Sequence, residues 1–192
     1  MCFDEMPYQM VAEKRVPIRA KAGCPQRYDY EYERRGVCNL SSCFSSRRLL
    51  GATSRSQGAA HGRRFRPPDE EAGRRALSRG KEKIRVVLDN LNTHTGAALY
   101  EAFEPQEARR ILSKLEFHYT PKHASWLNQV EIEFSVLCRQ SIGGRRIPDE
   151  GMLQREVAAW EEERNEKGAT VDWRFSVEDA REKLERLYPA KP

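Results

Sequence analysis

Short apolar runs, separated by polar and turn-forming residues, recur along the first half of this chain. Residues 84–89 hold a short apolar run rich in β-branched side chains (Ile84, Val86, Val87 and Leu88), which predicts a strand buried on both faces. A second apolar stretch over residues 1–11 predicts a first strand, in which Pro7 limits the length or marks a bulge. Tyrosine alternates with acidic side chains from 28 to 33, so we expect a half-solvated strand there, then a turn at Arg35-Gly36 and a new strand from 37 to 40.

Helical spacing dominates the second half of the chain. We predict a short strand at 115–119 and helices over 96–103, 107–115, 126–140, 149–166 and 177–187. Gly143-Gly144 is expected to end the helix over 126–140, and Ser176 with Asp179 predicts a capping box before the last helix. The length of 192 residues suits one domain, and strands that alternate with helices indicate the α/β class.

Residues 41–80 break this pattern. They hold nine Arg, seven Ser and five Gly but no Val, Ile, Met, Tyr or Trp, a composition that predicts neither a central strand nor a packed helix, apart from a weak helix at 69–79. One explanation is a basic, flexible insertion that grips phosphates. The other, which nine Arg without any Lys favour, is a reading-frame change that replaces an expected strand and helix until about Lys81.

Composition excludes several classes of protein. No run approaches the roughly 18 apolar residues of a membrane helix, and the N-terminus lacks the pattern of a secretory signal. Five cysteines without a Cys-x-x-Cys pair argue against a zinc site and indicate reduced thiols, as in the cytoplasm. The net charge of +5 arises from residues 41–80, which carry +6 and leave −1 elsewhere, so bulk charge by itself does not indicate nucleic-acid binding.

Three acidic residues from three separate elements are the candidate chemistry. Asp89 ends the predicted strand at 84–89, where open α/β sheets place their sites. Asp4 lies in the first apolar stretch, and Glu131 lies on a predicted helix. Converging carboxylates provide the hard oxygen ligands for two Mg²⁺ or Mn²⁺ ions about 4 Å apart. Glu133 is an alternative to Glu131 as the third acid, because Glu131 lies about 70° and Glu133 about 90° from the centre of the apolar helix face. Each acid taken alone is also explained as an ordinary exposed side chain.

The segments that hold these acids resemble one family. MCFDEM, DNLNTH at 89–94 and YTPKHASWLNQVE at 119–131 resemble the DDE-type transposases of bacterial insertion sequences, especially the mariner-related branch with its motif Thr-Pro-x-x-x-Ser-x-Leu-Asn-x-x-Glu. The resemblance covers residues 1–40 and 82–189. It implies a ribonuclease-H-like (retroviral-integrase-like) mixed sheet flanked by helices, incomplete around 41–80. The first strands of the catalytic domain would lie in 1–40, a doubtful or disordered segment in 41–80, and the remainder in 81–189.

The resemblance also implies a function. Asp4, Asp89 and Glu131 would be both catalytic and metal-binding residues, with two Mg²⁺ or Mn²⁺ ions as cofactors. The reaction would be metal-dependent cleavage of double-stranded DNA at element ends and strand transfer to target DNA. A homodimer, with no membrane association, would carry it out in the bacterial cytoplasm at the nucleoid. The family carries a helix-turn-helix domain ahead of the first Asp, whereas this chain begins three residues before Asp4, so we expect a truncated enzyme with little or no activity.

Further residues are candidate DNA contacts. They are His94 beside Asp89, the motif residues Lys122, His123, Trp126 and Asn128, and the pair Arg145-Arg146. A loop cap for His94, core packing for Trp126 and a basic helix-to-loop junction for the arginines remain open alternatives. Two rival functions also remain. One is a non-catalytic remnant that binds DNA non-specifically through its Arg-rich segment, and the other is a metal-dependent nuclease of the same fold with an unrelated role.

Overall fold

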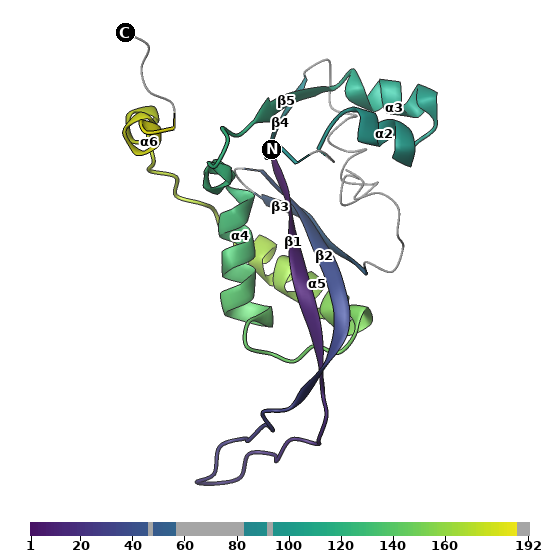
Figure 1. The fold of residues 1–192 in the computed structure, drawn as a ribbon, viewed down its shortest axis with the longest axis vertical. Coiled ribbons are helices and arrows are strands. Elements are labelled where there is room, and N and C mark those ends of the chain that lie inside the picture. The colour runs from purple at the N-terminus through teal and green to yellow at the C-terminus, as the bar shows by residue number, and fades with distance from the viewer. Residues whose placement is uncertain (46–47, 57–82, 92–93, 188–192) are drawn as a thin grey trace.

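One mixed sheet forms the centre of the computed structural model, which describes residues 1–45, 48–56, 83–91 and 94–187. Its five strands stand in the order β3-β2-β1-β4-β5 (Figure 1). The strands β1 (Cys2–Glu13), β2 (Tyr32–Ser45) and β3 (Arg48–Ser56) form an antiparallel meander. The strands β4 (Ile84–Leu88) and β5 (Leu115–Tyr119) continue the sheet in parallel from β1. The mixed α/β class that the sequence predicts is confirmed.

The junction between β1 and β2 differs from the sequence prediction. No turn occurs at Arg35-Gly36, because β2 starts at Tyr32 and runs through this dipeptide to Ser45. The β1–β2 register passes from Gln9↔Val37 to Val11↔Arg34, so Arg35 and Gly36 lie opposite Met10 as a bulge. Gly36 adopts a φ of 90°, which glycine tolerates, and its carbonyl accepts a hydrogen bond from Gln9 Nε2 at 2.8 Å. The glycine therefore bends one strand and does not reverse the chain.

The sheet is more complete around residues 41–80 than the sequence predicts. Residues 41–45 finish β2 opposite β1, with Cys43 and Phe44 buried, and residues 48–56 form β3 at the edge of the sheet. The expectation was wrong for these strands because ladder hydrogen bonds join main-chain groups, and an edge strand needs a partner on one side alone. The helix expected at 69–79 lies outside the described residues, as does the rest of 57–82.

Helices cover both faces of the sheet. On one face lie α4 (Val130–Leu137) and α5 (Glu150–Glu166), packed on Leu40 and Phe44 of β2. On the other face lie α2 (Ala97–Ala102) and α3 (Pro105–Leu112), packed on Phe3 and on Val86 and Leu88 of β4 (Figure 1). The last helix, α6 (Val177–Leu184), has the predicted capping box of Ser176 and Asp179. These helices confirm four predicted segments to within a few residues, and none of the helices described has the length and apolar character needed to cross a membrane.

The predicted helix over 126–140 is divided into three pieces. A 3₁₀ turn, η1 (Ser125–Leu127), comes first, then α4, then a π-helical turn, η2 (Cys138–Ile142). The first break lies at Asn128, whose backbone is extended with φ −78° and ψ 110°. At the second break, the N–H of Gly143 donates to the Cys138 carbonyl at 2.7 Å, so Gly143 closes the π turn.

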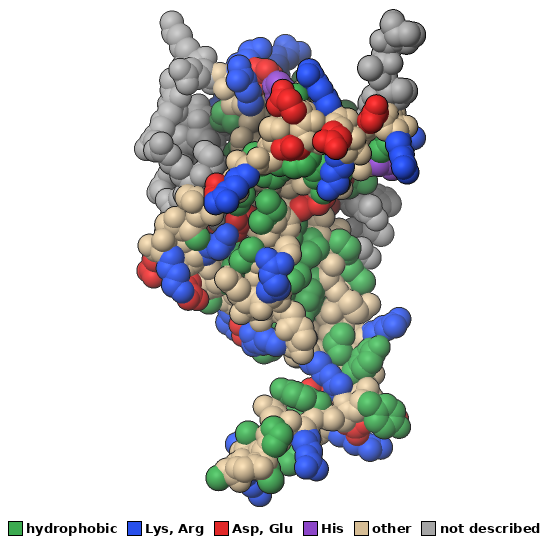
Figure 2. Space-filling model, turned by 90° about the vertical axis from the view of Figure 1, so that its left-hand side faces the viewer, with side chains coloured by type: hydrophobic (Ala, Val, Ile, Leu, Met, Phe, Trp, Pro, Cys, Tyr) green, Lys and Arg blue, Asp and Glu red, His purple; other side chains and the backbone are tan. Residues whose placement is uncertain are grey.

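Residues 14–31 project from the end of the β1–β2 pair as a long arm (Figures 1 and 2). Figure 2 shows hydrophobic and basic side chains along it; Val16 and Tyr30 are 92% and 85% exposed. Arg146 holds the base of the arm, because its guanidinium donates to the Asp29 carbonyl at 2.5 Å and forms an ion pair with Glu13.

Candidate active site

Asp4 is a buried carboxyl group on the face of the sheet that α4 covers. It is 6% exposed, and its Oδ1 accepts a hydrogen bond from the Glu5 N–H at 2.8 Å. Burial raises the pKa of Asp4 to about 6, and the negative charges of Asp89 and Glu131 contribute to the rise. The carboxyl groups of all three candidate acids therefore lie near enough for their charges to interact.

Asp89 reaches this region because of the register between β1 and β4. The parallel pairing Cys2↔Val87 places Asp4 and Asp89 two residues further along, on the same face of neighbouring strands. Asp89 follows directly after β4, at the carboxyl end of a parallel strand, as the sequence predicts. The Asp89 Oδ1 accepts a hydrogen bond from the Leu91 N–H at 3.2 Å.

His94 holds Asp89 from the other end of the DNLNTH loop. Its Nδ1 lies 2.5 Å from the Asp89 Oδ1, and because a carboxylate accepts but does not donate, Nδ1 is the donor. The His94 ring is buried and meets the ring of Phe3 edge-on, with centroids 5.4 Å apart. The Tyr119 hydroxyl donates to the His94 carbonyl at 2.8 Å. The ring thus lies between the strand that carries Asp4 and the loop that carries Asp89.

Glu131 and Glu133 have different surroundings in the structure. Glu131 is half-buried in the first turn of α4, and its charge acts on Asp4. Glu133 is 1% exposed and forms an ion pair with Arg164 of α5, whose Nη2 donates to Oε1 at 2.8 Å. The Glu133 carboxylate therefore joins α4 to α5. The helical wheel separated these two acids only narrowly, whereas the position of Arg164 distinguishes them clearly.

The donor set suits a divalent cation in its chemistry. Three carboxylates supply the oxygen ligands that Mg²⁺ prefers. Burial is the main cause of the raised pKa of Asp4, and the negative charges of Asp89 and Glu131, which add to it, are charges that a cation would neutralise. Among the described residues, no three His, Cys, Asp or Glu side chains lie close enough together to coordinate one metal ion without some movement. Two side chains that contact the acids each bury one polar atom that has no hydrogen-bond partner in the described structure. These atoms are Nε2 of His94, which contacts Asp89, and Oδ1 of Asn128, which contacts Asp4.

The predicted DNA contacts fall into buried and exposed groups. His94 and Asn128 are 1% and 0% exposed, so neither presents a surface to DNA in this structure. Lys122 and His123 are exposed in the turn after β5, where His123 adopts a φ of 62° that non-glycine residues seldom adopt. Trp126 is half-buried against Phe175, with ring centroids 5.0 Å apart, and Lys183 Nζ lies 4.4 Å from its ring centroid.

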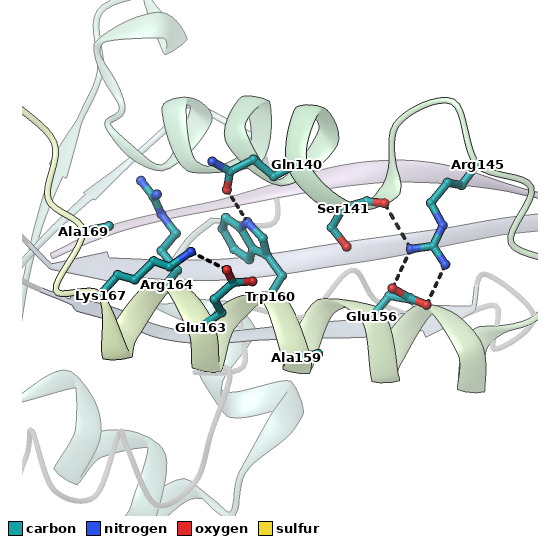
Figure 3. Close-up of a pocket in the computed structure, with 10 residues that line it drawn as sticks. All are labelled: Gln140, Ser141, Arg145, Glu156, Ala159, Trp160, Glu163, Arg164, Lys167 and Ala169. Carbon is teal, nitrogen blue, oxygen red and sulfur yellow. Dashed lines mark hydrogen bonds and ion pairs between the residues drawn. The ribbon is translucent and has the colours of Figure 1, made fainter.

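Arg145 and Arg146 follow the π turn, beyond the end of α4 that is opposite Glu131. Arg145 forms two hydrogen bonds with Glu156 of α5, at 2.6 and 2.7 Å, and Arg146 anchors the arm. Beside Arg145, a pocket of about 470 Å³ opens between the π turn and α5 (Figure 3). Its edges carry the ion pairs Arg145–Glu156 and Lys167–Glu163, and none of the three candidate acids lines it. This pocket is separate from the candidate active site.

Sequence reasoning missed how the acids are held. The contacts of His94 with Asp89 and of Asn128 with Asp4 were not foreseen, nor was the engagement of Glu133 by Arg164. For Asn128 a signal was present, since a polar side chain follows Leu127 and precedes Val130 at the start of an apolar helix face. A polar residue at such a position is buried only with hydrogen-bond partners, which the acidic strand supplies here.

Comparison with known proteins identifies one family. The family model of the DDE superfamily endonucleases matches residues 1–154, a span that contains all three acids and every strand that the structure describes. No curated protein and no solved structure matches the chain. Proteins of this superfamily typically use divalent metal ions, and their domain implies a DNA substrate and a transposase-like nuclease activity. With 154 of its 192 residues matched, the chain belongs to the DDE superfamily endonucleases.

Proposed function

We propose that this chain is the catalytic domain of a transposase from a bacterial insertion sequence of the mariner-related branch. The reaction would be metal-dependent DNA cleavage followed by strand transfer. The observation that carries the proposal is that the negative charges of Asp89 and Glu131 help to raise the pKa of the buried Asp4. The three acids, which come from three separate elements, therefore share one region. An antiparallel meander that continues into two parallel strands supports a ribonuclease-H-like arrangement.

Asp4, Asp89 and Glu131 would hold the metal, which we propose to be two Mg²⁺ or Mn²⁺ ions. Bound ions of this kind activate the attacking oxygen and stabilise the leaving oxygen of a phosphodiester. The protein's part is to keep the carboxylates in place before DNA arrives. Asp4 is held by β1 and the Glu5 N–H, Asp89 by His94 and the Leu91 N–H, and Glu131 by the first turn of α4.

DNA would approach the exposed turn between β5 and η1. We propose that Lys122 and His123 contact phosphates there, next to the segment that leads to Glu131. The Trp126 ring would hold this turn in place by packing against Phe175. Contacts from Arg145 or Arg146 would require their present ion pairs with Glu156 and Glu13 to open. The proposal places the protein in the bacterial cytoplasm, at the nucleoid.

A homodimer is part of the proposal, since transposition joins two element ends to one target. The arm at 14–31 supports it, because Val16, Ile18 and Tyr30 expose apolar surface of the kind that a second copy could cover. Sedimentation velocity of the wild type and of Val16→Ser with Tyr30→Ser tests this point. A dimer that persists unchanged in the double variant would contradict a role for the arm.

Cleavage of DNA by the purified chain tests the function. A duplex that carries the sequences flanking the gene is incubated with Mg²⁺, with Mn²⁺ or with a chelator. The sequence alone led us to expect little activity, but β2 and β3 complete the sheet beside Asp4. We therefore expect cuts at the element ends with either ion, and none with the chelator or with Asp89→Asn. The matched control is Asp172→Asn, the same chemical change at an exposed acid whose pair with Arg174 contributes little. Asp89→Asn that cleaves as fast as the control would refute the proposal.

The non-catalytic remnant remains the second candidate. Two observations favour this candidate. The described acids do not lie close enough together to coordinate one metal ion as they stand, and residues 41–80 carry a net charge of +6, which would attract DNA phosphates. Its mark would be DNA binding that weakens steeply with salt, ignores Mg²⁺ and has no preference for element ends. Metal-dependent cleavage without end preference would instead indicate a general nuclease.

A further inference from the structure

Asn128 contacts the main chain beside two of the candidate acids. Its Nδ2 donates to the carbonyl of Phe3, the residue before Asp4, at 2.7 Å, and lies 3.5 Å from the Asp4 Oδ2. The main-chain carbonyl of Asn128 accepts a hydrogen bond from the Glu131 N–H at 3.0 Å. The side chain of one residue thus holds β1 at Asp4, and its main chain holds the first turn of α4 at Glu131.

The orientation of the Asn128 amide is determined by its surroundings. With the amide reversed, Oδ1 would face the Phe3 carbonyl oxygen, and two acceptors would stand 2.7 Å apart. Nδ2 must therefore point toward β1. This leaves Oδ1 buried without a hydrogen-bond partner in the described structure. Packing alone does not explain the residue, because a leucine of similar size would fill the space and leave no unpaired oxygen.

The backbone at Asn128 sets where α4 begins. The chain leaves η1 after Leu127, is extended at Asn128, and starts α4 at Val130. This break directs the Asn128 side chain into the sheet. It also places Glu131 on the turn of α4 nearest to the strand that carries Asp4. A continuous helix over 126–140 would not provide the extended residue that makes this contact.

We propose that Asn128 is a positioning residue, which fixes the carboxylates of Asp4 and Glu131 relative to each other so that they can share a divalent cation. This inference rests on the proposed function of the three acids. Asn128 touches neither DNA nor the reacting atoms. It acts through β1 and through the start of α4, and its complete burial is what this role requires.

Titration of the purified 192-residue chain with Mn²⁺, in which electron paramagnetic resonance measures the free ion, tests the inference without DNA or catalysis. Asn128→Leu keeps the volume and removes both side-chain contacts, so we expect its affinity for Mn²⁺ to fall about tenfold or more. Val157→Ala, which shortens a core side chain on the buried face of α5, controls for a general loss of stability. Its affinity for Mn²⁺ should stay within about twofold of that of the wild type. Asp4→Asn measures the contribution of the acid itself.

The double variant with Asn128→Leu and Asp4→Asn should bind Mn²⁺ no more weakly than Asp4→Asn alone, because in the described structure the Asn128 side chain contacts only β1 at Asp4, and the leucine keeps the main-chain hydrogen bond to the Glu131 N–H. If Asn128→Leu does not fold, Asn128→Ser, which is too short to reach the Phe3 carbonyl, is measured in its place. Wild-type affinity in the Asn128 variant, together with weakened binding in Asp4→Asn, would overturn the positioning role and leave the proposed function intact. Unchanged binding in both Asp4→Asn and Asp89→Asn would overturn the proposed function itself.

Discussion

Replacement of Asp4 by asparagine is predicted to stabilise the fold at neutral pH while it removes a proposed metal ligand. Burial and the charges of Asp89 and Glu131 raise the pKa of Asp4 from its ordinary value of 3.8 to about 6. This difference corresponds to roughly 3 kcal/mol that the ionised carboxylate costs the folded state. Asparagine keeps an oxygen that can accept the Glu5 N–H but carries no charge, so most of that cost should disappear.

The sign of the pH dependence follows from the direction of the shift. The pKa of Asp4 is higher in the folded state than in the unfolded state, so folding takes up a proton between the two values. The contribution of Asp4 to the free energy of unfolding is therefore fully present below 3.8, and it is lost as the pH rises to about 6. The advantage of Asp4→Asn over the wild type should be near zero at about pH 4 and reach about 2–3 kcal/mol at about pH 7.5.

Urea unfolding followed by circular dichroism, in the presence of a chelator, measures this difference. Wild type and Asp4→Asn are compared at several pH values, with Asp172→Asn as the exposed control. The pH dependence that both proteins share cancels in the difference. Addition of Mg²⁺ should then stabilise the wild type but not Asp4→Asn, since a ligand that binds only the folded state raises its stability. A variant that is less stable than the wild type at every pH would show that the carboxylate of Asp4 is favourably paired, and the reasoning would be refuted.

Three further changes test other contacts of the structure. His94→Ala should lower Mg²⁺-dependent cleavage about 10- to 100-fold in single-turnover assays, because Asp89 loses its orienting partner; recovery of part of the rate in His94→Asn would support this, and an unchanged rate in His94→Ala would not. Glu133→Gln should lower the free energy of unfolding by about 3 kcal/mol, since it leaves Arg164 without its partner, while cleavage per folded molecule stays the same. Gly143→Ala should cost about 2–3 kcal/mol in urea unfolding, because a Cβ would lie 2.1 Å from the Cys138 carbonyl oxygen. Gly144→Ala, with φ +70° and open space around it, should cost only about 1 kcal/mol, and equal losses would contradict the account of the π turn.

Local patterns in the sequence determined much of the secondary structure. The apolar run of β4, the strand β5, the helix α5 and the capping box before α6 all lie where periodicity and capping residues place them. These signals are reliable because the hydrogen bonds and side-chain spacing that produce them act within a few residues. Asp4, Asp89 and Glu131 were also named from the sequence, through their positions after apolar runs and within a motif.

The tertiary structure decided the features that depend on a distant partner. Residues 41–45 and 48–56 are strands because β1 and β2 offer them main-chain hydrogen bonds, which composition does not reveal. In the same way, Gly36 bends a strand and does not end it because β1 continues beside it.

At the site, Arg164 on α5 engages Glu133 and leaves Glu131 to act on Asp4. Asn128 and His94, candidates for DNA contact by sequence, are buried against the strand and loop that carry the acids. Each of these outcomes depends on contacts between residues that lie far apart in the chain. The burial and charge that such contacts create are properties of the assembled sheet and its helices, so no local pattern in the sequence specifies them.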